Sequence, residues 1–285
     1  MSPSAFELET AVAPVDGVPG RYRAELSDRW CAPMVPQGGV ATALAIRAMA
    51  AEIGATGQPL RSITNVFAGA VRAGPVEVDV TIVRRGRSMT HALAQVRNEG
   101  QDSGHVAVAV FGASREGFEF TDIAMPQVPP PLECPSFRDP LPEDAEMRVE
   151  PFTFWENLEG RPAIGTPPWD HTTPRTSSEV AYWYRYDDPP RLDDGTLDPV
   201  AVIAMCDTMP GSVGQRVGPT DRVWLPPSAD LTVHLLGPAR SDWLLSHQHA
   251  RHAGDGYASI EMSLWNDDAT LVAYATQIMF FVFPD

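Results

Sequence analysis

One carboxylate in the sequence, Asp207, occupies a position that favours chemistry over stability. Val200, Ile203 and Asp207 recur at the i, i+3, i+7 spacing of one helix face, so the carboxylate shares its face with core residues. Asp207 also falls in the last turn of that helix, where the helix dipole disfavours negative charge. A carboxylate placed in this way is a candidate general base. The alternative is that Asp207 turns out to solvent or caps a neighbouring turn.

The helix that would position Asp207 has signals at both ends. Asp198 is a good N-cap, and Pro199 suits the first helical position because its ring fixes φ at a helical value. We expect Pro210-Gly211 to end the helix. Both signals together predict one helix from Asp198 to about Met209.

Composition and charge exclude several classes of protein. The chain has 285 residues, of which 44% are hydrophobic, and this content is typical of a globular protein. A net charge of -16 argues against a nucleic-acid partner, because phosphate binding needs clustered Lys and Arg. No apolar run reaches the roughly 18 to 20 residues of a membrane helix, and the first residues do not resemble a signal peptide. Three widely spaced cysteines, Cys31, Cys134 and Cys206, fit no disulfide or zinc pattern, so we expect a cytoplasmic protein without a membrane partner.

The predicted elements occur in the same order twice. A helix from Val40 to about Ile53 follows Gly38-Gly39, and four strands are predicted after it, as after the helix that carries Asp207. These eight strands cover residues 63–70, 76–84, 90–97, 106–111, 229–236, 243–251, 258–265 and 271–283. Gly38 aligns with Asp198, Gly74 with Gly237 and Val106 with Val272, at offsets of 160, 163 and 166 residues. The nearly constant offset indicates a duplication.

The two copies are separated by a segment that cannot form regular helix or central strand. Residues 125–142 contain seven prolines. We therefore divide the chain into a lead-in at 1–20, a first unit at 21–114, a Pro-rich linker at 115–150 and a second unit at 151–285.

A long helix wrapped by an antiparallel sheet, duplicated in one chain, resembles the double hotdog fold of the acyl-CoA thioesterase II family. The segments that carry the resemblance are Pro36-Gln37-Gly38-Gly39, Arg84 to Ser88, Ser228 to His234 and Asp268 to Gln277. The resemblance covers most of the chain and is weakest at residues 1–20 and 112–178. It implies an α+β fold of two hotdog units.

The resemblance also implies an enzyme that hydrolyses acyl-CoA thioesters with an Asp, a Thr and a Gln that hold and activate water. Matched position by position, these residues are Asp207, Ser228 and Gln277, with serine at the threonine position. A thioester carbonyl is already electrophilic, so a base, groups that orient water and an oxyanion site are sufficient. Backbone N–H groups of Gly38 and Gly39, at a helix N-terminus, are the candidate oxyanion donors. Coenzyme A enters as part of the substrate, and no separate cofactor is expected.

The duplication offers an internal comparison for these residues. In the sequence register, Asp207 aligns with Arg47, Ser228 with Asn65 and Gln277 with Phe111. The first unit therefore lacks the trio that the second unit carries.

Three arginines form the one local basic group that stands out in this acidic chain. Arg84, Arg85 and Arg87 flank Gly86 in a predicted hairpin. They are candidate ligands for the phosphates of coenzyme A. The alternative is a solvated hairpin tip.

Two further groups of polar residues are weaker candidates. Asp230 lies on the same predicted strand face as Ser228 and is the second candidate carboxylate. The histidines at 247, 249 and 252 are not expected to bind metal, because they do not share one strand face and no carboxylate completes a ligand set.

Two other functions stay open at this stage. The serine at the threonine position favours a non-hydrolytic acyl-CoA or acyl-ligand binding protein on the same fold. A hotdog dehydratase or hydratase would need a His paired with a carboxylate, and His234 with Asp230 is the available pair. The apolar strand at 278–283 suggests that a sheet edge or face is buried, so we expect a homo-oligomer.

Overall fold

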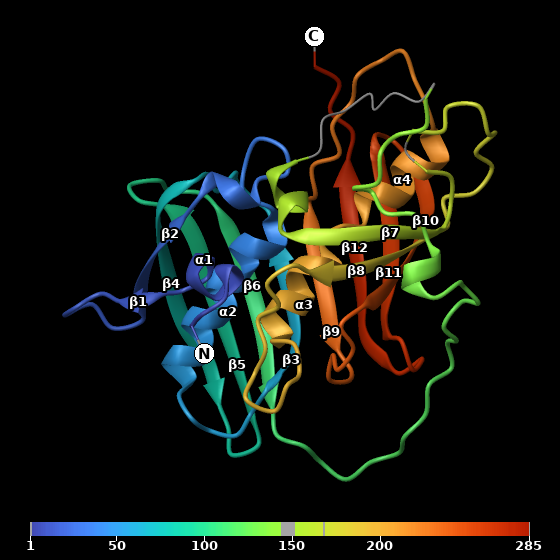
Figure 1. Cartoon of the computed structure of the whole chain (residues 1–285). Helices are drawn as coiled ribbons and strands as arrows, with labels where there is room; N and C mark the ends of the chain where they lie inside the picture. Colours follow the sequence, from blue (N-terminus) through green and yellow to red (C-terminus); the bar gives the residue numbers. More distant parts are fainter. Residues whose placement is uncertain (1, 144–151, 168, 285) are drawn as a thin grey trace.

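The architecture was determined from a computed structural model, which describes residues 2–143, 152–167 and 169–284. The strands of these residues form one antiparallel sheet in the order β1-β2-β4-β5-β6-β3-β9-β12-β11-β10-β8-β7 (Figure 1). The first six strands in this order come from the first unit and the last six from the second. The two units therefore join edge to edge through β3 and β9.

The first unit carries its strands around one long helix. Its elements are α1 (Ala5–Glu9), β1 (Ala13–Pro14), β2 (Arg21–Leu26), α2 (Gly38–Ile53), β3 (Leu60–Val66), β4 (Gly74–Arg85), β5 (Met89–Asn98) and β6 (His105–Gly112). A short 3-10 helix, η1 (Asp28–Trp30), precedes α2. Almost every residue of α2 up to Met49 is buried, because the sheet wraps around it.

The second unit repeats this arrangement. Its strands are β7 (Leu158–Ile164), β8 (Val180–Tyr186), β9 (Asp230–Leu235), β10 (Leu244–Gly254), β11 (Tyr257–Asn266) and β12 (Leu271–Phe280). Its helices are α3 (Pro199–Cys206) and α4 (Pro210–Val217), and the short 3-10 helices η2 (Pro131–Glu133) and η3 (Thr153–Glu156) precede β7. In Figure 1 the two units lie side by side, blue to green and yellow to red.

The predicted end of the second helix was wrong. The helix already ends at Cys206, with Asp207 as its C-cap, and Pro210 begins α4 instead of closing α3. Proline at a first helical position sacrifices no hydrogen bond, so it can open a helix as readily as it closes one. The long helix of the first unit therefore corresponds to two short helices in the second.

The sequence prediction missed several elements, among them α1 and β7. Residues taken as a lead-in form α1, whose Ser4 and Glu7 make a reciprocal capping box and whose Phe6 packs against Trp30. Strand β7 was missed because Gly160 and Pro162 interrupt its pattern. Proline is tolerated there because β7 is the last strand of the sheet.

The segment taken as a linker is partly packed. Cys134 lies in a hydrophobic cluster with Trp183, Trp243 and Trp265, and the Trp183 Nε1–H donates to the carbonyl of Pro129 at 3.0 Å. This part of the segment thus covers the second unit. Residues 144–150 of the predicted linker lie outside the described residues.

The strand pairing fixes the register of the duplication. Thr64 of β3 pairs with Thr232 of β9 where the units meet. The pair Leu60–Phe111 in the first unit corresponds to the pair Ser228–Met279 in the second. The register shift at Ile82/Arg84 in the first unit likewise corresponds to the shift at Ala250/His252 in the second. Each of these positions differs from its mate by 168 residues, for example 232 − 64 = 168.

This register corrects two of the sequence alignments. The counterpart of Ser228 is Leu60 rather than Asn65, and the counterpart of Gln277 is Ala109 rather than Phe111. The offset used for Ser228 was taken from the Gly74 and Gly237 turns, where insertions accumulate. The offset used for Gln277 was taken from a strand match that is two residues out of register, and a shift of two residues leaves the inward and outward alternation unchanged.

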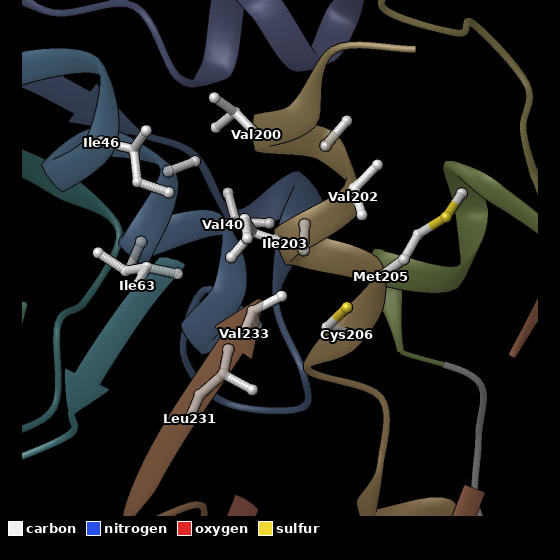
Figure 2. Packing of buried hydrophobic residues seen from close by; sticks show 14 of the residues in the cluster. Val40, Ile46, Ile63, Val200, Val202, Ile203, Met205, Cys206, Leu231 and Val233 are labelled. Carbon is white, nitrogen blue, oxygen red and sulfur yellow. The ribbon is translucent and has the colours of Figure 1, made fainter. Parts of the chain in front are cut away.

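The core lies where the helices of both units meet the inner face of the sheet. Figure 2 shows Val40 of α2 and Ile203 of α3 packed against Leu231 and Val233 of β9. Burial of these side chains holds the two helices together at the junction of the units. Among the described residues, no helix has both the length and the apolar character needed to cross a membrane.

Candidate active site

The end of α3 directs Asp207 toward the start of α2. The Gly39 N–H donates to Asp207 Oδ2 at 2.8 Å, so the helix N-terminus of one unit holds the carboxylate of the other. Gly39 permits this approach, because a Cβ there would lie 2.8 Å from the Cα of Ala204 and 3.0 Å from the Cβ of Asp207. The site is therefore built at the junction of the two units.

Two side chains from the second unit complete the contacts of the carboxylate. Gln277 Nε2–H donates to Asp207 Oδ1 at 2.5 Å, and Ser228 Oγ–H lies at 3.5 Å from the same oxygen. Gln277 is 1% exposed, and its Oε1 has no hydrogen-bond partner in the described part of the chain. The fold thus brings together the three residues that the resemblance selected, although the serine contact is long.

The surroundings of Asp207 suit it to act as a base near neutral pH. Burial raises the pKa of Asp207 to about 6 from an ordinary value of 3.8. Hydrogen bonds from the Gly39 N–H, Gln277 and Ser228 act in the opposite direction and lower this pKa. A carboxylate of this kind is ionised at neutral pH yet binds a proton more readily than an exposed one.

The expected oxyanion site is partly occupied. Gly39 was expected to offer its N–H to a substrate oxygen, but that N–H already binds Asp207, and the Gly38 N–H also lowers the pKa of the carboxylate. The role of Gly39 as an oxyanion donor stays a prediction, and in the structure the anion nearest to its N–H is the Asp207 carboxylate.

Gln37 was not singled out in the sequence, although it ties the two helices together. Its Nε2–H groups donate to the carbonyl of Ala204 at 2.8 Å and to the carbonyl of Asp207 at 3.1 Å. Its Oε1 accepts from the Val40 N–H as the N-cap of α2. An amide just before a Gly-Gly helix start was the signal that could have identified it.

The ring of Phe67, from the first unit, lies near the carboxylate of Asp207. A Cβ on Gly38 would lie 2.5 Å from a ring atom of Phe67 and 2.9 Å from Asp207 Oδ2, so the ring and the carboxylate meet at this glycine. The rings of Phe67 and His105 contact each other edge to face, with centroids 4.9 Å apart. Burial lowers the pKa of His105 to about 4, so its ring is neutral.

The counterpart of this site in the other half of the molecule is closed by an ion pair. Arg47 stands where the second unit has Asp207, and its guanidinium binds the carboxylate of Asp198 at 2.5 Å. Pro199 replaces Gly39 and has no N–H to donate. A cavity of about 210 Å³ next to Pro199 is lined largely by apolar residues such as Leu60 and Leu235. The Asp207 site therefore holds a carboxylate bound by uncharged donors, whereas its counterpart holds an ion pair beside a largely apolar cavity.

The arginine hairpin lies away from Asp207. Arg85 donates to the carbonyls of Ile53 and Glu52 and so caps the C-terminal end of α2. Gly39 lies at the other end of this helix, which at 1.5 Å rise per residue is about 20 Å away. Arg84 and Arg87 are exposed, and their role toward coenzyme A stays a prediction.

The remaining candidates have contacts of their own. Asp230 Oδ1 accepts from the Ile278 N–H at 2.8 Å, which anchors β9 to β12. His247 pairs with Glu179 at 2.9 Å, a carboxylate that the sequence did not place near it. No group of three or more metal-ligating side chains occurs among the residues described.

Comparisons with known proteins agree with this architecture. A family model of the acyl-CoA thioesterase C-terminal domain matches residues 131–281, and a model of the N-terminal domain matches residues 26–112. A conserved protein of unknown function with a hot dog fold from Alicyclobacillus acidocaldarius is 25% identical, with a TM-score of 0.82 over 99% of each chain. An acyl-CoA thioesterase II from Mycobacterium marinum is 21% identical, with a TM-score of 0.77 over 99% of each chain.

A third solved structure, a tesB protein of Mycobacterium avium subs. paratuberculosis, is 20% identical, with a TM-score of 0.74 over 97% of this chain and 98% of that one. No curated protein sequence matched the chain. The solved structures share the double hotdog arrangement that the sequence predicted.

Proposed function

The chain belongs to the acyl-CoA thioesterase family, and from this premise we propose that it hydrolyses an acyl-CoA thioester to a free acid and coenzyme A. The observation that carries the proposal is the environment of Asp207. A buried carboxylate with a raised pKa is held by Gly39, Gln277 and Ser228 at the junction of two units. Nothing in the packing of the fold requires a carboxylate there, since Arg47 occupies the equivalent position.

The reaction needs no covalent intermediate. Asp207 accepts a proton from a bound water, while the unpartnered Oε1 of Gln277 accepts the second proton of that water in a hydrogen bond. The water oxygen attacks the thioester carbonyl carbon, and the carbonyl oxygen takes the negative charge. When the tetrahedral intermediate collapses, the carbon–sulfur bond breaks and Asp207 returns its proton to the leaving thiolate. The products are the acid and the thiol of coenzyme A.

The proposal is tested by thiol release from purified protein with acyl-CoAs of graded chain length. We expect stoichiometric thiol and free acid from at least one of them. Tight binding of acyl-CoAs by calorimetry, without thiol release, would support a non-hydrolytic binding protein instead.

The rate should depend on pH through Asp207. Only the ionised carboxylate can accept a proton, so kcat/KM should rise with pH up to about 6 and level off above it. The measurement is kcat/KM for one acyl-CoA from about pH 5 to about pH 8. A flat profile, or one that falls as pH rises over this range, would contradict the role of Asp207.

Gln277 should matter more than Ser228. Both side chains bind the same oxygen of Asp207, but the glutamine bond is 2.5 Å long, whereas the serine bond, at 3.5 Å, is at the limit for a hydrogen bond. We expect Gln277→Ala to lower kcat about 10- to 100-fold and to move the inflection of the pH profile upward, because this bond lowers the pKa of Asp207. Ser228→Ala should lower kcat by less than about fivefold. Equal effects of the two variants would contradict the geometry.

A further inference from the structure

Asn65 of β3 is a buried amide whose hydrogen-bonding groups are unused. Its exposed fraction is 0%, and neither Oδ1 nor Nδ2 has a hydrogen-bond partner within the described residues. Buried polar groups in folded proteins are nearly always paired. An unpaired amide is therefore a costly feature, and it calls for an explanation by a ligand.

The amide lies on the face of the sheet that carries the site. Along β3, Asn65 alternates with exposed neighbours and shares its side with Phe67, whose ring meets Gly38 at the carboxylate. Across the sheet, Asn65 pairs with Leu231 of β9. On the other side of β9, Thr232 pairs with Thr276 of β12, so the next pair in this antiparallel register is Leu231 with Gln277. Leu231 therefore lies between Asn65 and Gln277. Strands are about 5 Å apart, so the backbones of Asn65 and Gln277 are about 10 Å apart, one on each side of the junction.

The duplication supplies a comparison for Asn65 as well. At the structural offset of 168 residues its counterpart is Val233, which is also fully buried but apolar. The counterpart of Gln277 is Ala109, which is equally apolar. The same fold position therefore accepts a valine without loss of the sheet, and the buried amide belongs to the first unit, whereas the carboxylate of Asp207 belongs to the second.

We propose that Asn65 is the substrate-binding donor of the site, with its Nδ2–H directed at the thioester carbonyl oxygen. The proposal rests on the proposed thioester hydrolysis and adds to it a residue of the first unit. The need for such a donor arises because the Gly39 N–H is already bound to Asp207. A neutral amide suits this task, because it stabilises the negative charge that develops on the carbonyl oxygen without repelling the base.

The role of Asn65 follows from its place opposite Gln277. The base and the water lie on the side of the second unit, so the carbonyl oxygen of a substrate held at the junction points away from them, toward β3. Each unit then contributes a distinct part: the second unit activates water, and the first unit stabilises the oxyanion. This division gives each unit a role in the reaction proposed for the Asp207 site.

The test is the Asn65→Val variant, which introduces the residue of the counterpart position. We expect kcat for the best acyl-CoA to fall about 10²- to 10³-fold, with KM changed by less than about threefold, because an oxyanion donor acts chiefly in the transition state. Asn65→Ser, which keeps a shorter donor, should recover part of the loss. The thermal midpoint of Asn65→Val should equal or exceed that of the wild type, because an unpaired buried amide is removed.

Thr90→Val is the matched control. Thr90 is likewise fully buried in the first unit, with an Oγ1 that has no hydrogen-bond partner in the described part of the chain, but it pairs with Arg85 at the far end of α2. This variant should keep kcat and KM within about twofold. Unchanged kcat in Asn65→Val, or a loss confined to KM, would overturn the proposal while wild-type hydrolysis stands. Absence of hydrolysis in the wild type itself would instead overturn the proposed function.

Discussion

Replacement of Asp207 by Asn is expected to abolish most acyl-CoA hydrolysis while leaving acyl-CoA binding intact. The amide has nearly the shape of the carboxylate and can still accept the Gly39 N–H, but it cannot take a proton from water. General-base assistance is typically worth about 10²- to 10⁴-fold in rate, and kcat should fall by that amount. Thiol release measures the loss, and calorimetry with the inactive variant measures the retained affinity.

The same variant should be more stable than the wild type at alkaline pH. The pKa of Asp207 is raised in the folded state, so the folded protein binds more protons than the unfolded chain between about pH 4 and pH 6. Stability associated with this group is present below pH 4 and is lost as the pH rises through 6. The neutral amide of Asp207→Asn does not ionise, so the variant does not lose this stability as the pH rises. The thermal midpoint of the variant should therefore exceed that of the wild type at about pH 8 and approach it at about pH 4. A lower midpoint at pH 8 would show that the carboxylate is structural.

Gly39→Ala is expected to have the second largest effect, on both stability and rate. The added methyl group would lie 2.8 Å from the backbone of Ala204 and 3.0 Å from both Asp207 and the Oε1 of Gln37. It must force α2 and α3 apart, and overpacking of this kind costs about 1 to 3 kcal/mol of unfolding free energy. The displaced carboxylate should also lose the Gly39 N–H, so kcat should fall at least about tenfold.

A second helical glycine provides the control for this prediction. A methyl group added to Gly214 of α4 would meet no heavy atom within 4 Å beyond its own helix backbone and chain neighbours. Gly214→Ala should therefore be neutral or slightly stabilising, as expected from helix propensity. Denaturant unfolding and kcat should be measured for both variants. Equal stability of the two alanine variants would contradict the close packing at Gly39.

Two members of the trio carry a signal of burial that can be read from the sequence alone, whereas Ser228 was selected only by the family resemblance. Asp207 lies on an apolar helix face, and Gln277 lies on an apolar strand face, so both had to be buried. Their partnership came from the family resemblance, because Gln277 and Ser228 lie 70 and 21 residues from Asp207 along the chain. The architecture was predicted for the same reason, since alternation and turn residues recur in both halves.

The first-unit side of the site was not predictable in this way. Asn65 looks like any polar residue in an alternating strand, and only the strand register shows that it faces inward, in the row that holds Gln277. Gln37 and Phe67 act through contacts with α3 and with Gly38, which are made only after the units pack. The sequence did not predict that α3 ends at Cys206, because Pro210 is compatible with both a helix end and a helix start.

The most direct test of the central claim is thiol release from a graded panel of acyl-CoAs, with wild type and Asp207→Asn assayed in parallel. The expected result is hydrolysis of at least one acyl-CoA by the wild type and a loss of about 10²-fold or more in the variant, which still binds that acyl-CoA. Full activity in Asp207→Asn, or binding without thiol release by the wild type across the whole panel, would contradict the assignment of Asp207 as the base that activates water.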